Sequence, residues 1–204
     1  SISGNITINT DRLLIAANSG ITANSGQVNL RTVTPGNEIH LGSLTDTAFA
    51  LELSDAELDR IFANTLSIGT TASGSIIANA ALSPANVLNL MLTSGNDILI
   101  NDALTVAQAL TLRAGDNLIL GTSSTVSAGS VSANVDFTQD DGATGGVGLV
   151  LGTLAGSPVT LDGGAEADTL QGAQGIDQVV NGNGGNDTIT SSGEGHYFGG
   201  SGND

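Results

Sequence analysis

The segment Gly95-Asn96-Asp97-Ile98-Leu99-Ile100 returns about 20 residues later as Gly115-Asp116-Asn117-Leu118-Ile119-Leu120. The same shift lays Thr105-Val106 onto Thr125-Val126. Self-similarity at this period, with several short strands in each period, is the signature of a solenoid, in which each rung covers the apolar face of its neighbour. We therefore expect an all-β fold, a parallel β-helix or β-solenoid, built outward from this segment.

Short runs of alternating apolar and polar residues recur along the whole chain and predict many short strands. Gly, Asn, Asp and Ser separate the runs, as expected of turns between strands. A β-sandwich with regular turns is the alternative, but a sandwich would not need the repeat register. The runs are Ile6-Thr7-Ile8, Val28-Asn29-Leu30, Leu66-Ser67-Ile68, Ile98-Leu99-Ile100, Leu110-Thr111-Leu112, Leu118-Ile119-Leu120 and Leu149-Val150-Leu151.

One segment predicts a helix instead of a strand. Ser54 is suited to the N-cap, and Glu57, three residues later, completes a capping box. Apolar residues then follow at helical spacing, so we expect a helix of two to three turns over about residues 54–63. Covering an open face of the solenoid is its favoured role, and binding a partner is the alternative. The apolar residues are Leu58, Ile61 and Phe62.

The composition is strongly acidic, with 20 Asp and Glu residues against 4 Lys and Arg residues and a formal net charge of −16. Such a charge disfavours nucleic acid and anionic membrane surfaces as partners and favours cations. Aromatic residues make up only 2% of the chain, so small side chains among Leu, Ile and Val predict thin stacked strands. The absence of cysteine excludes disulfides and thiolate metal sites.

We expect an exported protein. The only methionine is Met91 and no charged and then apolar leader opens the sequence, so the true N-terminus and any signal peptide should lie outside it. No apolar run approaches the roughly 18 residues that a membrane helix needs. The expected localisation is extracellular or the bacterial cell surface, without membrane insertion.

The first three quarters of the chain resemble a known family of surface proteins. The run Arg31-Thr32-Val33-Thr34-Pro35-Gly36-Asn37-Glu38-Ile39-His40-Leu41-Gly42 is followed by Leu53-Ser54-Asp55-Ala56-Glu57-Leu58-Asp59-Arg60-Ile61 and Leu66-Ser67-Ile68-Gly69. These segments resemble repeats of very large bacterial adhesins of the filamentous-haemagglutinin-like type, over residues 1 to about 155. The resemblance implies a right-handed parallel β-helix that serves as stalk or scaffold on the cell surface.

From Gly163 the sequence changes to nine-residue units. Residues 163–171 and 172–180 form two units, residues 182–190 form a third after the extra residue Asn181, and residues 199–204 begin another. These units resemble the G-G-x-G-x-D-x-U-x repeats of the RTX family, where U is a large apolar residue. The resemblance implies a calcium-binding parallel β-roll. We therefore expect solenoid rungs over residues 1–160 and a roll over residues 161–204, incomplete at its C-terminal end.

The spacing of these units has a direct physical meaning. Glycines allow tight turns with positive φ that point carbonyl oxygens inward, and an aspartate at the sixth position adds a carboxylate. Calcium takes six to eight oxygen ligands and would sit between loops stacked on one edge. One apolar residue of each strand, Leu170, Val179 or Ile189, should fill the interior. The expected metal-binding residues are Asp168, Asp177, Asp187, Asp204, Gly164, Gly175, Gly182, Gly185, Gly200 and Gly202.

The two edges of the roll should differ. Two nonapeptides make one turn, so Asp168 should face the loop that holds Asp187, and Asp187 should face the loop that ends at Asp204. Asp177 belongs to the opposite edge, where the next loop, around His196, lacks an aspartate. We expect one or two well-formed sites on the first edge and a weak or empty one on the second.

Several sequence features depart from the repeat or only partly match it. Glu166 and Ala173 replace expected glycines, and the unit over residues 191–198 is one residue short. The upstream match Ser94-Gly95-Asn96-Asp97 is half a motif, so a plain turn is its favoured interpretation and a ligand role the alternative.

Three classes of function remain open at this point. The favoured one is a structural or adhesive segment of a secreted bacterial surface protein or fibre. Its expected partners are calcium ions and copies of itself or adjacent repeats, with a cell-surface glycan or another cell as a further candidate. The alternative is a polysaccharide lyase or epimerase, which needs clustered catalytic side chains; a third is a threonine-rich surface that binds ice or carbohydrate. We assign no catalytic residue, because His40, His196 and the pair Asp140-Asp141 lack partners at catalytic spacing.

The chain ends suggest a tandem arrangement. Asp204 followed by Ser1-Ile2-Ser3 would read as one complete nonapeptide. We therefore expect the two termini at opposite poles of an elongated body, with strands exposed for continuation.

Overall fold

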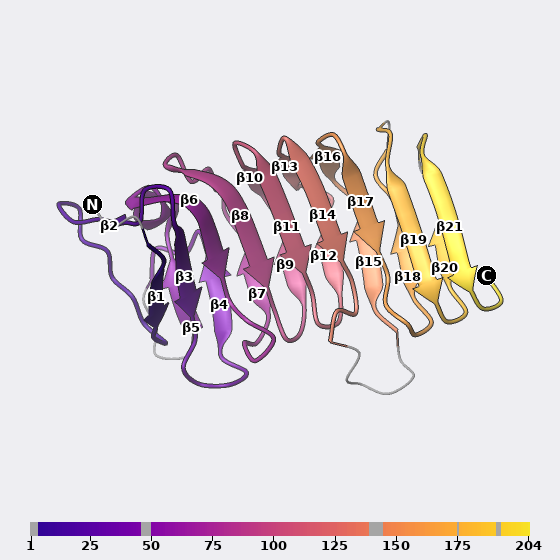
Figure 1. Cartoon of the computed structure of the whole chain (residues 1–204), viewed down its shortest axis with the longest axis horizontal. Helices are drawn as coiled ribbons and strands as arrows, with labels where there is room; N and C mark the ends of the chain where they lie inside the picture. The colour runs from indigo at the N-terminus through magenta and orange to yellow at the C-terminus, as the bar shows by residue number, and fades with distance from the viewer. Residues whose placement is uncertain (1–3, 46–49, 139–144, 175, 191–192) are drawn as a thin grey trace.

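The computed structural model describes residues 4–45, 50–138, 145–174, 176–190 and 193–204. Every strand pair in these residues is parallel. The chain winds into an elongated β-helix with β1 (Ile6–Asn9) near one end and β21 (His196–Ser201) near the other (Figure 1). The prediction of a parallel β-solenoid is confirmed, and the sandwich alternative is wrong.

Three sheets form the walls of the described β-helix. The ten-stranded sheet contains β1, β2 (Ile21–Thr22), β3 (Gln27–Arg31), β6 (Ile61–Ile68), β8 (Val87–Thr93), β11 (Ala109–Arg113), β14 (Ser130–Asn134), β17 (Val159–Asp162), β19 (Val179–Gly184) and β21. The eight-stranded sheet contains β4 (Glu38–Leu41), β5 (Ala50–Leu53), β7 (Ile76–Ala78), β9 (Ile98–Ile100), β12 (Leu118–Leu120), β15 (Val147–Val150), β18 (Thr169–Gln171) and β20 (Thr188–Thr190). The three-stranded sheet contains β10 (Ala103–Thr105), β13 (Thr125–Ser127) and β16 (Thr153–Ala155).

The cross-section changes along the axis. Rungs in the middle have three strands, such as β11, β12 and β13, whereas the rungs β17–β18 and β19–β20 have two. The boundary expected at residue 160 falls inside β17, and both long sheets run across it without a break (Figure 1). The C-terminal part is therefore joined to the rest through shared sheets.

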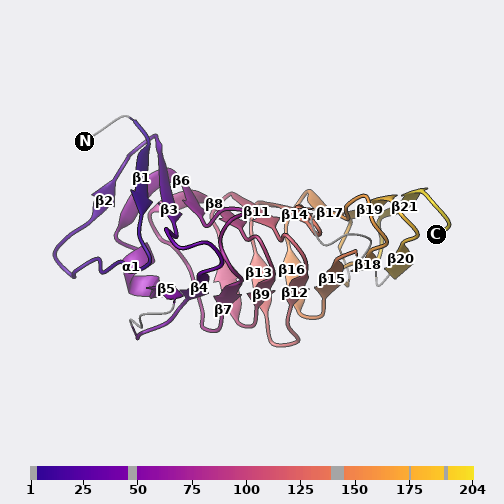
Figure 2. The same ribbon diagram turned by 90° about the horizontal axis from the view of Figure 1, so that it is seen from below.

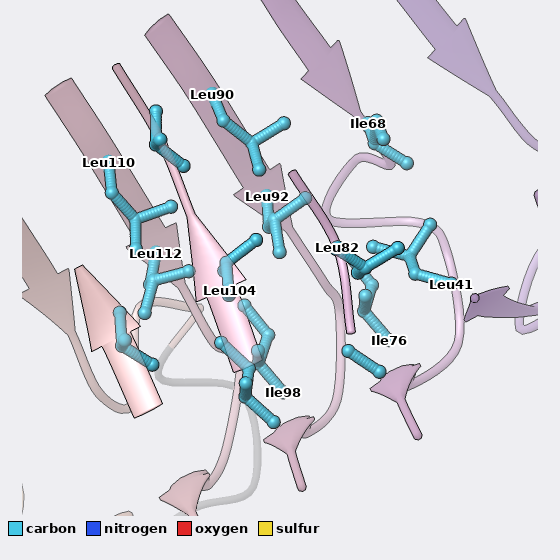
Figure 3. Close-up of a cluster of buried hydrophobic side chains, with 14 of the residues drawn as sticks. Leu41, Ile68, Ile76, Leu82, Leu90, Leu92, Ile98, Leu104, Leu110 and Leu112 are labelled. Carbon is cyan, nitrogen blue, oxygen red and sulfur yellow. The ribbon is translucent and has the colours of Figure 1, made fainter. Parts of the chain in front are cut away.

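Inward-facing aliphatic side chains stack into ladders from rung to rung. Ile76, Ile98 and Leu118 occupy equivalent positions on β7, β9 and β12, and each is almost completely buried. Figure 3 shows Leu90 and Leu92 of β8 and Leu110 and Leu112 of β11 directed into the same interior as Ile98 and Leu104. Because strand side chains alternate between faces, one apolar residue in every two is enough to fill this narrow core.

The predicted repeat register is correct on one sheet and wrong on another. Ile98 pairs with Leu118, as the shift of about 20 residues predicts. On the three-stranded sheet, however, Leu104 pairs with Val126 and Thr105 with Ser127, so the expected match of Thr105 to Thr125 is wrong by two residues. The corner before β13 is longer than the corner before β10, and this added length shifts the strand.

The predicted helix is real but shorter than expected. It is the single turn α1 (Asp55–Leu58), and the Glu57 carboxylate accepts hydrogen bonds from the Ser54 backbone N–H at 3.0 Å and hydroxyl at 2.8 Å. Ile61 already belongs to β6, where it pairs with Ile21. The alternation of β6 thus overrides the helical spacing, and Phe62 is 41% exposed instead of packing inward.

The helix lies at the N-terminal end of the β-helix, beside β5 and below β1 (Figure 2). Leu58 is buried, Glu57 accepts a hydrogen bond from the Ile15 backbone N–H at 3.0 Å, and Arg60 donates one to the Ile15 carbonyl at 2.6 Å. α1 is therefore held against the segment that contains Ile15. The tripeptide Ser1-Ile2-Ser3 lies outside the described residues.

Adjacent residues of β9 provide a test of this architecture. Ile98→Ala should lower the free energy of unfolding by about 2 to 5 kcal/mol, because the side chain leaves a cavity in the ladder. Leu99→Ala is the matched control, since Leu99 points outward from the same strand, and it should cost less than half as much. Denaturant unfolding of both variants measures the difference, and equal losses would contradict the assignment of faces.

Candidate metal-binding edge

Three glycine-rich loops stack at the corner that leads from the ten-stranded to the eight-stranded sheet. We call this corner the aspartate edge; it comprises loops 163–168, 182–187 and 199–204. The strands that precede the loops pair in the order β17, β19 and β21, and β18 pairs with β20 after the first two. Each loop is therefore held directly over its neighbour.

The aspartates of these loops form a hydrogen-bonded column. Asp187 accepts a hydrogen bond at Oδ1 from the backbone N–H of Asp168 at 2.9 Å. Asp204 accepts the equivalent bond from the backbone N–H of Asp187 at 3.1 Å. The structure thus brings Asp168, Asp187 and Asp204 together in the order that their spacing predicts. Their role as calcium ligands stays a prediction.

Asp168 is the most buried member of the column, at 1% exposure. Burial raises its pKa above the ordinary value, and the charges of Asp187 and Glu166 raise it further. Hydrogen bonds from the backbone N–H groups of Gly164 at 2.6 Å and Gly146 at 2.7 Å act in the opposite direction. The site therefore disfavours the carboxylate unless a positive charge is added.

Asp187 has an oxygen with no donor. It is 5% exposed, and its Oδ2 is a buried atom without a hydrogen-bond partner. A Cβ added to Gly182 would lie 2.1 Å from this oxygen, so only glycine fits beneath it. Asp187, Gly199 and Asp204 also line a cleft of about 270 Å³ together with Ile189 and Tyr197. A buried carboxylate oxygen without a donor, in a residue that also lines a cleft, fits an oxygen-binding cation.

The backbone divides the three loops into two kinds. In loop 182–187, Asn183 and Gly185 have φ of 73° and 106°, and in loop 199–204, Gly200 and Gly202 have φ of 105° and 159°. No residue of loop 163–168 has positive φ, and in this loop Glu166 stands at the position that Gly185 holds in loop 182–187. The last two loops therefore share the conformation that the repeat predicts.

Carbonyl oxygens of loop 182–187 lie against the glycine backbone of loop 199–204. A Cβ on Gly200 would lie 2.1 Å from the Asn183 oxygen, and one on Gly202 would meet the Gly185 oxygen even more closely. Main-chain oxygens are thus available between loops 182–187 and 199–204. This matters because, among the described residues, no three Asp, Glu or His side chains gather closely enough to hold a metal ion by themselves.

The opposite edge is built differently from the prediction. Asp177 is exposed, and Gln178 instead is buried at 2% exposure. In the same way Val180, not Val179, fills the interior, where it pairs with Leu161. The extra residue of this repeat lies in the loop before β19 and not at Asn181, which belongs to β19. A shift of one residue exchanges the two faces of a strand.

Other residues singled out from the sequence have different surroundings. Gly175 and Asp140-Asp141 lie outside the described residues. Asp97 accepts hydrogen bonds from the Asn117 backbone N–H at 3.2 Å and side-chain amide at 2.8 Å, which fits its interpretation as a turn. His40 contacts Glu38 at 2.9 Å, and His196 stacks on Phe198 with a centroid distance of 6.4 Å.

Sequence reasoning missed two buried polar residues, Gln178 and Asp136. Asp136 has φ of 52° and is 1% exposed, and its Oδ2 would lie 2.5 Å from a Cβ on Gly164. No glycine motif surrounds Asp136, so only its place in the same corner one rung before loop 163–168 reveals it. Gln178 was hidden by Asp177, which has the spacing of the repeat.

Comparison with known proteins gives no match: no family model, curated protein or solved structure matches the chain. No helix in the described part of the chain is long and apolar enough to cross a membrane. What the molecule does must therefore be inferred from the loops themselves.

The raised pKa of Asp168 gives a pH test. Because its folded pKa lies above the ordinary value of 3.8, the deprotonated group opposes folding. With chelator present, deprotonation of Asp168 should lower the free energy of unfolding as the pH rises from 3.8 through the folded pKa. At higher pH its effect should stay constant. Carbon-detected NMR titration of the Asp168 carboxyl should show the raised pKa with chelator and a lower value with calcium. A pKa at or below 3.8 with chelator would contradict the assignment.

Proposed function

We propose that this chain is a calcium-stabilised structural segment of a secreted bacterial surface protein or fibre. The observation that carries the proposal is the Asp187 carboxylate, which is buried in a column of aspartates and has an oxygen without a donor. A buried, unpaired carboxylate is strongly unfavourable. A bound calcium ion supplies the missing positive charge and accepts several oxygens at once.

The ligands are drawn from two loops. Asp187 and Asp204 provide carboxylates, and the carbonyl groups of loop 182–187 that lie against loop 199–204 provide neutral oxygens. Gly182, Gly185, Gly200 and Gly202 make this approach possible, in agreement with the RTX-like spacing of the sequence. Asp168 and Gly164 extend the column toward the solenoid, where the altered loop conformation makes a weaker second site.

The rest of the molecule suits a rod. Two parallel sheets run from the first rungs to the last, and each rung is bonded to the next along the axis. This is the form expected of a stalk in an adhesin or surface fibre, with adjacent repeats or copies of itself as neighbours along the axis. Extracellular calcium modules usually bind at about 10⁻⁴ to 10⁻³ M, so the roll would be loaded outside the cell and empty inside it.

The residues that a polysaccharide enzyme would need have structural partners instead. Arg60 is bound to the Ile15 carbonyl, and Arg113 lies over the Phe137 ring at 5.0 Å. His40 lies between Glu38 and Glu52. These contacts support the structural role over the lyase or epimerase alternative.

Calcium should order the C-terminal part of the chain. Adding about 1 mM calcium to the chelated protein should increase the β-sheet signal in circular dichroism and raise the Tm, because the cation offsets the repulsion between aspartates. Magnesium at the same concentration is the control, and it should do less because it loses its water ligands reluctantly. Identical spectra and Tm values with calcium and with chelator would overturn the proposal.

Two aspartates of the roll make a matched pair. Asp187→Ala should weaken calcium binding by about tenfold or more, because it removes a charged ligand from the column. Asp177→Ala should leave the affinity within about twofold of the wild type, because Asp177 is exposed on the other edge. Calorimetric titration of both variants decides the matter, and equal losses would show that the aspartate edge is assigned wrongly.

A further inference from the structure

The opposite edge of the roll repeats one contact of the aspartate edge with an uncharged side chain. On the aspartate edge, the last residue of each loop folds its side chain back over the first glycine. A Cβ on Gly163 would lie 2.4 Å from Asp168 Oδ2, and one on Gly199 would lie 2.3 Å from Asp204 Oδ2. On the opposite edge, a Cβ on Gly172 would lie 2.7 Å from Gln178 Oε1.

The Gln178 side chain forms hydrogen bonds with both backbone polar groups of Ala173 in this loop. Its Oε1 accepts a hydrogen bond from the Ala173 backbone N–H at 2.9 Å, and its Nε2 donates one to the Ala173 carbonyl at 2.7 Å. Nε2 also lies 3.2 Å from the Tyr197 hydroxyl, which donates to the Gly193 carbonyl at 3.1 Å. The backbone carbonyl of Gln178 accepts the His196 N–H at 2.7 Å. One residue therefore joins two successive rungs.

We propose that Gln178 locks the second edge of the roll without a cation and so determines that calcium acts on the aspartate edge alone. A carboxylate only accepts hydrogen bonds, so a loop closed by aspartate needs donors or a metal ion. A carboxamide has one acceptor and two donors, and it closes the same loop as a neutral group. Gln178 is 2% exposed, so water cannot supply the hydrogen bonds that an aspartate or glutamate at this position would lack.

The consequence is a one-sided response to calcium. Without calcium the loops of the aspartate edge unfold locally, while the loop at Gln178 stays hydrogen-bonded. The C-terminal rungs therefore open at one edge and do not unfold completely. The part of this inference that concerns Gln178 stands on its own hydrogen bonds, whereas the calcium response of the aspartate edge rests on the proposed function.

Hydrogen exchange of the whole chain separates the two edges. The reporters on the aspartate edge are the amides of Asp168 and Asp187, and those on the opposite edge are the amides of Ala173 and His196. Replacing calcium by chelator should speed exchange of the first pair by about tenfold or more and change the second pair by less than about twofold. Equal acceleration of Ala173 and Asp187 would overturn the inference. If no amide responds to chelator, the calcium proposal fails while Gln178 is still tested by its variants.

Variants of Gln178 are compared with Gln174→Ala, a control in the same loop whose side chain is exposed. In chelator, Gln178→Ala should speed exchange of the Ala173 amide by about tenfold or more, because its acceptor is lost, and Gln174→Ala should match the wild type. An unchanged rate in Gln178→Ala would also overturn the inference.

Gln178→Glu keeps the shape and changes the charge, which distinguishes hydrogen bonding from packing. Its folded pKa should be raised by burial, so the variant should resemble the wild type at low pH and lose Ala173 protection as the pH rises through that pKa. The protonated acid has one donor and one acceptor, as the loop requires. Protection that is independent of pH would contradict the role of a neutral group. This comparison remains usable if Gln178→Ala does not fold.

Discussion

The backbone hydrogen bonding of each rung to the rungs before and after it is the constraint on which the structure depends. Neighbouring strands lie about 4.8 Å apart, so corners stack backbone on backbone and leave little room for side chains. A Cβ on Gly115 would lie 2.2 Å from the Gly95 oxygen, and one on Gly95 would lie 2.3 Å from the Thr71 oxygen. The glycines at these corners are thus a direct result of rung stacking, and the aliphatic ladders fill what remains inside.

Polar groups at the corners must find their hydrogen-bond partners in the next rung, because the thin apolar interior contains no donors or acceptors for them. Upstream, a carboxylate meets an amide: Asp97 accepts from Asn117, and Asp162 accepts from the side chains of Asn134 and Asn181. At the aspartate edge, a carboxylate follows a carboxylate. Each takes one backbone N–H from its neighbour, and the second oxygen of Asp187 is left without a donor. The same stacking rule thus creates both carboxylate–amide ladders and a position that suits a cation.

How much the sequence predicts depends on how tightly each corner is constrained. The ladder of Ile98 and Leu118 was predictable because a fixed period and buried aliphatic residues coincide there. The match of Thr105 to Thr125 failed because corners of two different lengths precede β10 and β13, and no residue type marks the difference. The exposed positions of these threonines gave no apolar signal to correct it.

In the C-terminal rungs, a shift of a single residue likewise could not be predicted from the sequence. Val179 and Val180 are both able to fill the interior, so the apolar pattern could not place the extra residue of that repeat. The spacing of Asp177 then favoured the wrong side chain, although the choice of Gln178 follows from physics once the register is known. The helix was overpredicted for a related reason: local spacing around Leu58 was correct, but tertiary pairing of Ile61 with Ile21 prevails.

The free energy that one calcium site can contribute is small, so calcium would stabilise part of this molecule without deciding whether the whole chain folds. At a free calcium concentration about tenfold above Kd, one site adds about 1.4 kcal/mol, which is small beside the roughly 5 to 15 kcal/mol that stabilises a folded domain. The long ladders around Ile98 do not depend on such a term. The last rungs would gain more from it, because Ile189 and Tyr197 are only partly buried and line an open cleft. In our proposal, Gln178 holds these rungs in register while the aspartate edge is empty, so calcium would stiffen an end that is already aligned.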